Sequence, residues 1–224
     1  MAIQPEIDAI RGILAPIHNP VVLECGAECG SDMFMFEEAA GKLFQHIMVE
    51  PDPRNAQHIL DNCGPSKYAG HTPRPLGQMR RLILGAVSDV SGFQPFHFSE
   101  NAENGNHASG SLLEPTGHLK AFPEISFSSS GYVMCYTLDD IFEREWLKKV
   151  DLLWSDVQGA EAGMIRGGPK TLAHTHYLFM EVEGVEVYRG EALRDDLIAM
   201  LPGWKLIGDF GCNILMENLG FPCC

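Results

Sequence analysis

An apolar run followed by a glycine turn constrains the fold of this chain more than any other stretch. Residues 21–30 read Val-Val-Leu-Glu-Cys-Gly-Ala-Glu-Cys-Gly. The run is typical of a buried parallel strand, and Gly26 and Gly30 allow the backbone to turn sharply and approach a ligand closely. Because such a turn opens a helix N-terminus with free amide donors, the stretch predicts either a nucleotide or nucleoside site or an ordinary strand-to-helix turn.

The composition of the chain favours a single α/β domain over residues 1–224, which are 45% hydrophobic. Sixteen basic against thirty acidic side chains give a net charge of −14, which disfavours nucleic acid and anionic membranes as partners. No apolar run approaches the ~20 residues that span a bilayer, and the N-terminus carries acids where a signal peptide carries lysines. We therefore expect a cytoplasmic protein with no membrane segment.

The seven cysteines are scattered singly apart from the last two residues, which predicts reduced thiols and not a disulfide framework. Cys25 and Cys29 flank the glycine turn, but one Cys-x3-Cys pair without a second pair is a weak zinc signal. His174 and His176 alternate at the entry of a strand, and an isolated pair of this kind is more often structural than a base or metal site.

Hydrophobic spacing predicts a helix over 5–18 within the N-terminal segment 1–20, and a second helix after Gly30 that carries Leu43 and ends near Gly41. A second strand over 46–50 ends in Glu50 and leads into a helix that reaches Cys63 and Gly64. An acid at this place beside a glycine turn accepts both hydroxyls of a ribose in nucleoside-binding sheets. Alternatively, Glu50 is a helix cap or a solvated loop acid.

The middle of the chain predicts a loop over 64–81, a third strand over 82–87 that ends at Ser88, and an insertion or lid over 92–131. The insertion is rich in Asn, Gly, Ser and His and lacks helical periodicity, and long loops of this kind are usually functional. We expect it to form a wall of a substrate pocket.

The last third of the chain predicts further strands and helices. A short strand over 132–136 precedes a helix that Thr137 or Asp139 caps, and a buried strand over 150–154 leads through Asp156 into a helix that closes near Gly167. Another strand over 177–182 and a helix over 191–201 precede a terminal antiparallel hairpin over 204–216.

Four blocks of the sequence resemble those of FkbM-type S-adenosylmethionine-dependent methyltransferases. The glycine turn resembles the family's Asp-Val-Gly-Ala-Asn-x-Gly block, and residues 49–53 (Val-Glu-Pro-Asp-Pro) resemble its Glu-Pro-x-Pro block. Residues 137–140 and 156–161 match its Thr-Leu-Asp-Asp and Asp-x-Glu/Gln-Gly-x-Glu blocks, in the same order. Glu24 and Glu28 replace the usual Asp and Asn, and Trp154 stands where many members have Lys.

The resemblance implies an α/β, Rossmann-like class I methyltransferase fold, with a mostly parallel seven-stranded sheet and an antiparallel terminal strand. It also implies S-adenosylmethionine as cofactor and O-methylation of a small molecule or sugar. The acids of the glycine turn agree, because they would repel the pyrophosphate of NAD and attract the cationic sulfonium and ammonium of S-adenosylmethionine. Two other hypotheses remain open: a binding module that has lost catalysis, and an NAD-dependent oxidoreductase.

Two sets of candidate site residues follow. The cofactor candidates lie at the glycine turn and at the ends of the second and third strands: Glu24, Gly26, Ala27, Glu28, Gly30, Glu50, Pro51, Val87 and Ser88. The catalytic candidates are Asp156, Glu161 and Glu181, whose carboxylates are expected to converge. Crowded carboxylates raise one another's pKa, which suits a general base, or else bind a divalent cation, and no metal ligand is assigned. As an alternative, Asp156 and Glu161 only cap a helix.

Overall fold

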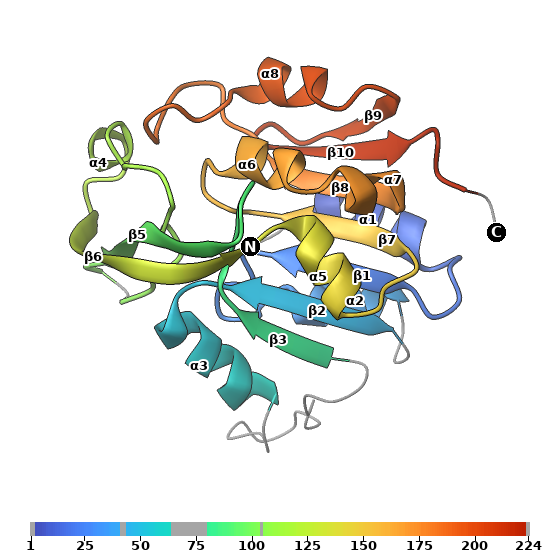
Figure 1. Ribbon diagram of the computed structural model, residues 1–224, viewed down its shortest axis with the longest axis horizontal. Coiled ribbons are helices and arrows are strands. Elements are labelled where there is room, and N and C mark those ends of the chain that lie inside the picture. Colours follow the sequence, from blue (N-terminus) through green and yellow to red (C-terminus); the bar gives the residue numbers. More distant parts are fainter. Residues whose placement is uncertain (1–2, 41–43, 64–79, 104, 223–224) are drawn as a thin grey trace.

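The computed structural model describes residues 3–40, 44–63, 80–103 and 105–222, and its centre is a seven-stranded sheet (Figure 1). The strand order is β3-β2-β1-β7-β8-β10-β9. The strands of this sheet are β1 (Val21–Cys25), β2 (Gln45–Glu50), β3 (Arg80–Leu84), β7 (Val150–Ser155), β8 (Thr175–Glu181), β9 (Trp204–Asp209) and β10 (Asn213–Asn218).

The first five strands of that order run parallel, and β10 is antiparallel to both β8 and β9. This arrangement confirms the predicted α/β fold with its antiparallel terminal strand. Because β1, β2 and β7 run parallel, their carboxyl ends lie at the same edge of the sheet. The strand order reverses at β1, since β2 and β3 lie on one side of it and β7 lies on the other. In open parallel sheets, ligands bind at the carboxyl ends of the strands, at the point where the strand order reverses.

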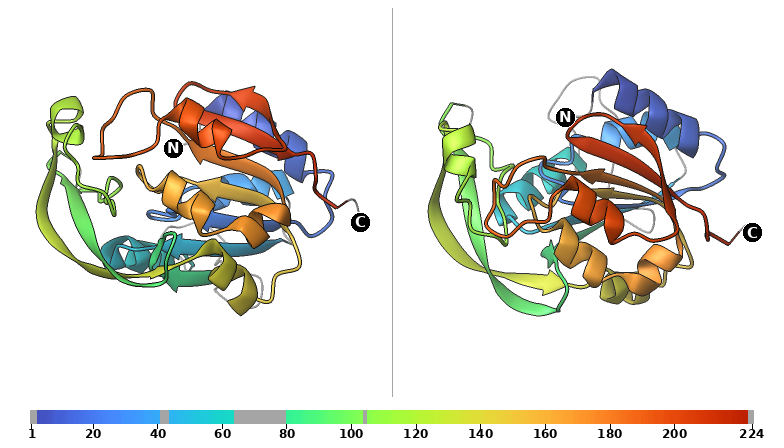
Figure 2. Two further views of the ribbon diagram at one scale, coloured as in Figure 1. Left: turned by 45° about the horizontal axis from the view of Figure 1, so that its top comes forward. Right: turned by 90° about the horizontal axis from the view of Figure 1, so that it is seen from above.

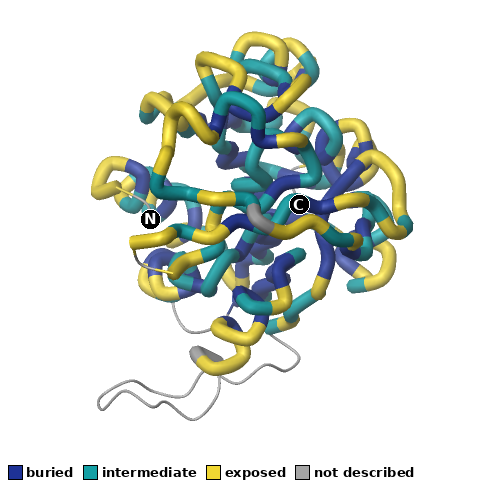
Figure 3. The backbone as a smooth tube through the Cα atoms, turned by 90° about the vertical axis from the view of Figure 1, so that its left-hand side faces the viewer, coloured by how far each residue is buried: buried dark blue, intermediate teal, exposed yellow. Residues whose placement is uncertain are grey.

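Helices cover both faces of the sheet (Figure 2). On one face lie α1 (Gln4–Leu14), α2 (Met33–Ala40) and α3 (Pro53–Cys63), and on the other α5 (Leu138–Arg144), α6 (Glu161–Arg166), α7 (Pro169–Ala173) and α8 (Arg194–Ala199). Leu23 of β1 packs in the core under the second group, and Val22 packs in the core under the first. Both faces of β1 are therefore buried, which explains its uninterrupted apolar run. Buried segments gather at the centre of the molecule (Figure 3).

The segment 92–131 is the main departure from the sequence-based prediction. Much of it forms a long antiparallel hairpin of β5 (Gly92–Asn101) and β6 (Ile125–Tyr136), which joins β4 (Ala86–Val87) in a second sheet of order β4-β6-β5. The short helix α4 (His118–Ala121) lies in the connection. The predicted third strand divides at Gly85, so that β3 stays in the large sheet while β4 pairs with β6.

Several predicted element ends shift by a few residues. Helix α1 ends at Leu14 instead of residue 18, because Pro16 has no N–H with which to continue the helical hydrogen bonds. The expected helix end at Gly41 and Leu43, and the expected loop over 64–79, lie outside the described residues. Within the described part of the chain, no helix combines the length and apolar character that crossing a membrane requires.

Candidate functional site

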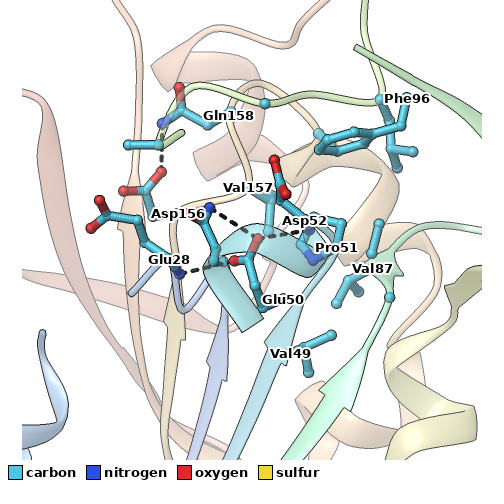
Figure 4. A pocket seen from close by; sticks show the side chains of 18 of the residues that line it. Glu28, Val49, Glu50, Pro51, Asp52, Val87, Phe96, Asp156, Val157 and Gln158 are labelled. Carbon is cyan, nitrogen blue, oxygen red and sulfur yellow. Dashed lines mark hydrogen bonds between the residues drawn. The ribbon is translucent and has the colours of Figure 1, made fainter. Parts of the chain in front are cut away.

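A cleft lies at the carboxyl ends of β1, β2 and β7, which we call the main cleft (Figure 4). It encloses about 750 Å³, including its open mouth. The loop between β5 and α4 contributes to its outer wall, whereas we expected the insertion to form a wall of the acceptor pocket. Its described lining residues are Gly26, Glu28, Val49, Glu50, Pro51, Asp52, Asn55, Gly85, Ala86, Val87, Phe96, His107, Ala108, Gly110, Leu112, Asp156, Val157, Gln158 and Ala160.

The turn after β1 fits tightly against the turn after β7. Gly26 has a φ of +83°, and a Cβ atom placed on it would lie 1.7 Å from the carbonyl oxygen of Asp156. The amide of Asp156 in turn donates to the carbonyl of Cys25 at 2.9 Å. Gly26 is therefore required by the neighbouring backbone, whereas we expected it to leave room for a ligand.

Glu50 ends β2 on the floor of the main cleft, with its carboxylate already held in place. The amides of Glu28 and Asp52 donate to its two oxygens at 2.9 and 2.8 Å, and the Asn55 side chain lies 3.3 Å from one of them. Only 3% of Glu50 is exposed, and this burial raises the pKa of its carboxyl to about 8. Further donors from a ligand would favour its ionised form and lower that pKa.

The described lining of the main cleft is acidic. Glu28, Glu50, Asp52 and Asp156 contribute carboxyl groups, and no lysine or arginine is among the lining residues that the structure describes. This chemistry suits a cationic or neutral nucleoside better than a phosphate group. No group of three His, Cys, Asp or Glu side chains within the described ranges has an arrangement that would hold a metal ion.

Gln158 connects the carboxylates that follow β7 and end β8. Its side-chain nitrogen donates to Asp156 at 2.6 Å and to Glu181 at 2.9 Å. Its side-chain oxygen lies 2.8 Å from the hydroxyl of Tyr188, which donates either to it or to the Ser109 carbonyl. Burial, and after it the neighbouring Asp156, raises the pKa of Glu181 well above the usual range. The predicted convergence of Asp156 and Glu181 is thus present.

A second cleft, which we call the side cleft, opens next to the main cleft and shares Gln158 with it. It encloses about 530 Å³, including open space. Its walls come from the connection between β5 and β6 and from the loop after β8. The described residues that line it are Ser109, His118, Phe122, Ile125, Gln158, Gly159, Glu181, Glu183, Val187 and Tyr188.

The candidate residues divide between the clefts and the surrounding structure. Those that line the main cleft are Gly26, Glu28, Glu50, Pro51, Val87 and Asp156, and Glu181 lines the side cleft. Glu161 lies on neither described lining. It is 4% exposed and accepts a hydrogen bond from the amide of Val157 at 3.1 Å, in the turn before α6. Glu161 is thus an acid of the first turn of α6, and among the described residues α6 has no side-chain cap hydrogen bond.

The other cofactor candidates also point away from the described cleft lining. Glu24 is buried on the face of β1 that α1 and α2 cover, the face of Val22, because successive side chains of a strand alternate between faces. Its carboxyl group lies 2.7 Å from Nε2 of His46. Ala27 packs in a small core cluster, and Gly30 lies against Ile59 of α3. Ser88 is buried, and its hydroxyl contacts Gln94.

Sequence reasoning missed several lining residues. Asp52 lies inside the Glu-Pro-Asp-Pro block and Asn55 lies in the first turn of α3, so the proximity of both to Glu50 was predictable from the spacing. Gln158 lies inside the Asp-x-Gln-Gly-x-Glu block, of which only the acids Asp156 and Glu161 were predicted as site residues. The contributions of Phe96 and His107 depend on the path of the hairpin, for which the sequence carries no local signal.

Trp154 is a core residue, with 5% of its surface exposed. Its ring stacks on Phe179 at 4.0 Å between centroids and meets Phe36 edge-on at 5.4 Å. The position therefore contributes packing and no contact to either cleft. His176 likewise has a packing role, since its ring stacks on Phe221 at 4.5 Å between centroids.

Two sequence comparisons match most of this chain. A family model described as "Methyltransferase FkbM domain" matches residues 24–221. The 2-O-methyltransferase NoeI of Sinorhizobium fredii is 34% identical over 194 residues, which make up 86% of this chain and 75% of that protein.

Two solved structures resemble the fold at lower sequence identity. The methyltransferase FkbM from Methylobacillus flagellatus KT is 13% identical with a TM-score of 0.55, over 89% of this chain. The match spans 43% of that protein's chain, less than half of its length. Fibrillarin from Aeropyrum pernix, solved with bound S-adenosyl-L-methionine, is 14% identical with a TM-score of 0.47, over 93% of this chain and 73% of its own.

Proposed function

This chain belongs to the FkbM methyltransferase family, and we propose that it methylates an oxygen of a sugar or another small hydroxylated molecule. It is an enzyme whose cofactor is S-adenosylmethionine. The similarity to a 2-O-methyltransferase supports oxygen as the acceptor atom. The net charge of −14 supports a small acceptor over a nucleic acid, whose phosphates would be repelled.

The main cleft fits S-adenosylmethionine by the chemistry of its residues. Glu50, at the end of β2, is the group that would accept the ribose hydroxyls, and Asn55 and the amide of Asp52 hold it in place. The carboxylate of Glu28 would favour the cationic methionine end. The same acids, with no lysine or arginine among the described lining residues, oppose the pyrophosphate that an NAD-dependent oxidoreductase would bind.

The position of Asp156 carries the catalytic proposal. It lines the main cleft and is joined through Gln158 to Glu181, which lines the side cleft. The cofactor supplies a methyl group bonded to a sulfonium sulfur, and the neutral thioether that remains after transfer is an excellent leaving group. The protein must therefore align the acceptor hydroxyl and remove its proton. Asp156 is our candidate for the base, with Glu181 as the carboxyl group that lies next to it.

The contact between the two clefts also favours an enzyme over a module that only binds the cofactor. A binding module needs no passage from its cofactor to a second cavity. Here both clefts share Gln158, and the acids Asp156 and Glu181 lie at the point where they meet. An acceptor hydroxyl in the side cleft would thus have a carboxylate within reach.

The proposed function is tested with S-adenosylmethionine that carries a ¹³C-labelled methyl group. The enzyme is incubated with this cofactor and a panel of methyl glycosides and small alcohols. We expect release of S-adenosylhomocysteine and a new ¹³C signal at the chemical shift of a methyl ether. A label found only on nitrogen or carbon would contradict O-methylation. If the protein binds S-adenosylhomocysteine in calorimetry but transfers no label to any acceptor, the proposed acceptor class is wrong.

A further inference from the structure

We propose that the side cleft is the acceptor subsite, and that it accepts an uncharged sugar ring and rejects sugars that carry a carboxylate or phosphate. This inference rests on the proposed function, since it concerns the acceptor of the same reaction. Its observations come from residues that have no part in cofactor binding. They concern hydrogen-bonding groups without partners, an aromatic wall, and the sign of the charge in the cleft.

Two acids of the side cleft are placed to accept hydrogen bonds from sugar hydroxyls. Glu181 ends β8, and Glu183 follows it by two residues on the same wall. Glu181 accepts one hydrogen bond from Gln158, and the Glu183 carboxylate has no side-chain hydrogen bond within the described part of the chain. A carboxylate accepts up to about four hydrogen bonds, so both groups retain capacity for a ligand.

His118 supplies a buried polar group that lacks a partner. It opens α4, lines the side cleft and is only 3% exposed. Among the described residues, its Nδ1 atom has no hydrogen-bond partner. Buried ring nitrogens are normally satisfied, and this atom is closed to solvent, so a ligand or ordered water in the cleft would pair with it only after the ring turns toward the cavity.

Aromatic rings form an apolar wall around His118. The centroid of its ring lies 4.9 Å from that of Phe122 and 5.3 Å from that of Tyr188. Phe122 is 43% exposed although it is large and apolar, and Ile125 and Val187 lie on the same cleft. A sugar ring has one face of C–H groups and a rim of hydroxyls, so it matches an apolar wall that faces acceptor side chains.

The charge of the side cleft sets its selectivity. Glu181 and Glu183 line it, Asp156 accepts a hydrogen bond from the lining residue Gln158, and the described lining contains no lysine or arginine. A carboxylate or phosphate on the sugar would lose water without gaining a cationic partner, and the Glu183 carboxylate would repel it. The raised pKa of Glu181 favours the neutral form of that acid, which still accepts hydrogen bonds from hydroxyls. A neutral hydroxyl, by contrast, donates to both acids. The cleft therefore distinguishes a hexoside from the matching uronoside.

The test compares neutral methyl glycosides with their uronic acid counterparts. The panel contains methyl glucoside, galactoside, mannoside, fucoside and rhamnoside, together with methyl glucuronoside and galacturonoside. Binding is followed by saturation-transfer NMR with S-adenosylhomocysteine present, and turnover by release of S-adenosylhomocysteine from S-adenosylmethionine. We expect at least one neutral glycoside to bind and react, and its uronoside to have a kcat/KM at least about 100-fold lower.

Two variants locate the effect in the side cleft. Phe122→Ala removes the exposed part of the wall and should raise the KM of the sugar about tenfold while the KM of S-adenosylmethionine stays unchanged. Glu183→Gln keeps the size of the side chain and should reduce the discrimination against uronosides about tenfold. Glu217→Gln is the control, because it removes the same charge at a residue that pairs with Tyr177, toward the opposite end of β8. Glu217→Gln should change neither the KM of the sugar nor the discrimination against uronosides.

Three outcomes would overturn the inference. Equal use of glycosides and uronosides would exclude the proposed charge selection. An unchanged sugar KM in a folded Phe122→Ala variant would place the acceptor elsewhere. Failure of every neutral glycoside to bind or react would exclude this acceptor class, whether or not other alcohols are methylated. The proposed O-methylation itself fails separately, only if no oxygen of any acceptor receives the labelled methyl group.

Discussion

Glu50, the proposed acceptor of the ribose hydroxyls, is held in place by the protein alone. Two backbone amides fix the orientation of its carboxylate, so little side-chain freedom is lost when a ribose arrives. Burial nevertheless holds the pKa of this carboxyl at about 8. In the free protein near neutral pH, the group is therefore mostly protonated, and it accepts hydrogen bonds from ribose hydroxyls best when ionised.

We expect nucleoside affinity to increase as the pH rises through 8. Ligand hydroxyls lower the pKa of Glu50, so binding releases a proton and weakens about tenfold between pH 9 and pH 7. Calorimetry with 5′-methylthioadenosine measures this without interference from the amino group of S-adenosylmethionine. Glu50→Gln should remove the pH dependence. A wild-type affinity that is flat over this range would exclude Glu50 as the ribose acceptor.

Gly26 is predicted to be essential for stability as well as for binding. Any side chain there meets the carbonyl of Asp156, and the residue would also have to keep its positive φ. Gly26→Ala should lower the free energy of unfolding by about 2 kcal/mol or more. Gly12→Ala on α1 is the control, because nothing lies within 4 Å of its added methyl, and helical Ala should stabilise by about 0.5–1 kcal/mol. Chemical denaturation measures both, and equal stabilities would contradict a clash at Gly26.

At the scale of elements, one buried serine fastens the insertion to the turn after β7. Ser111 pairs with His97 of β5, and its hydroxyl donates to the backbone carbonyl of Gln158 at 2.7 Å. The same hydroxyl accepts from the amide of Leu113 at 2.9 Å. The loop that walls the main cleft is thus tied to the residue that connects Asp156 with Glu181.

Loss of this hydroxyl should loosen both elements together. Ser111→Ala leaves the half-buried carbonyl of Gln158 and the half-buried amide of Leu113 without this partner, which should cost about 1 kcal/mol of stability. Hydrogen exchange should increase at residues 156–160 as well as at 107–113. Ser126→Ala on β6 is the control, since its exposed hydroxyl lies 3.4 Å from its acceptor and contributes little. Faster exchange at 107–113 alone would show that the two segments are not coupled.

The regular α/β elements were predictable from sequence, and the hairpin was not. The strand β1 and its turn carry a local signal, because both faces are buried and the glycines stand at fixed places. In β5 the signal is broken by Pro95, which the strand tolerates because it lies at the edge of its sheet. In β6 the four serines among residues 126–130 hide the alternation. The structure of this region depends on the pairing of β5 with β6, which the local sequence does not indicate.

The residues of the candidate site were likewise only partly predictable from the sequence. Glu50 and Asp156 were identifiable because each follows a buried strand at the sheet edge where ligands bind. Glu24 and Glu161 carry the same charge and stand in equally suggestive blocks, but strand alternation and a local amide contact turn them away from the clefts. The side cleft depends on contacts between segments far apart in the chain, such as Tyr188 with Ser109. The spacing of residues in the sequence does not predict such contacts.

At the scale of the whole molecule, the strand order brings two cavities to one edge of the sheet. The crossover from β3 to β7 places the turn after β7 against the turn after β1, and β8 lies beside β7 with Glu181 at its end. The loop after β8 and the insertion then enclose the second cavity. In our proposal the cofactor occupies the main cleft and the acceptor the side cleft, and Gln158, which lines both, connects Asp156 with Glu181.

The most direct test of this account is the single-turnover rate of methyl transfer by Asp156→Asn. The methyl acceptor is the one found with labelled S-adenosylmethionine, and Glu217→Gln serves as the charge-matched control. Asparagine keeps the size of the side chain and an oxygen for Gln158, so S-adenosylhomocysteine should bind within a few-fold of wild type. The transfer rate should fall by about 10² or more, because the base is lost. A variant that binds the cofactor and transfers methyl as fast as wild type would contradict the catalytic role of Asp156.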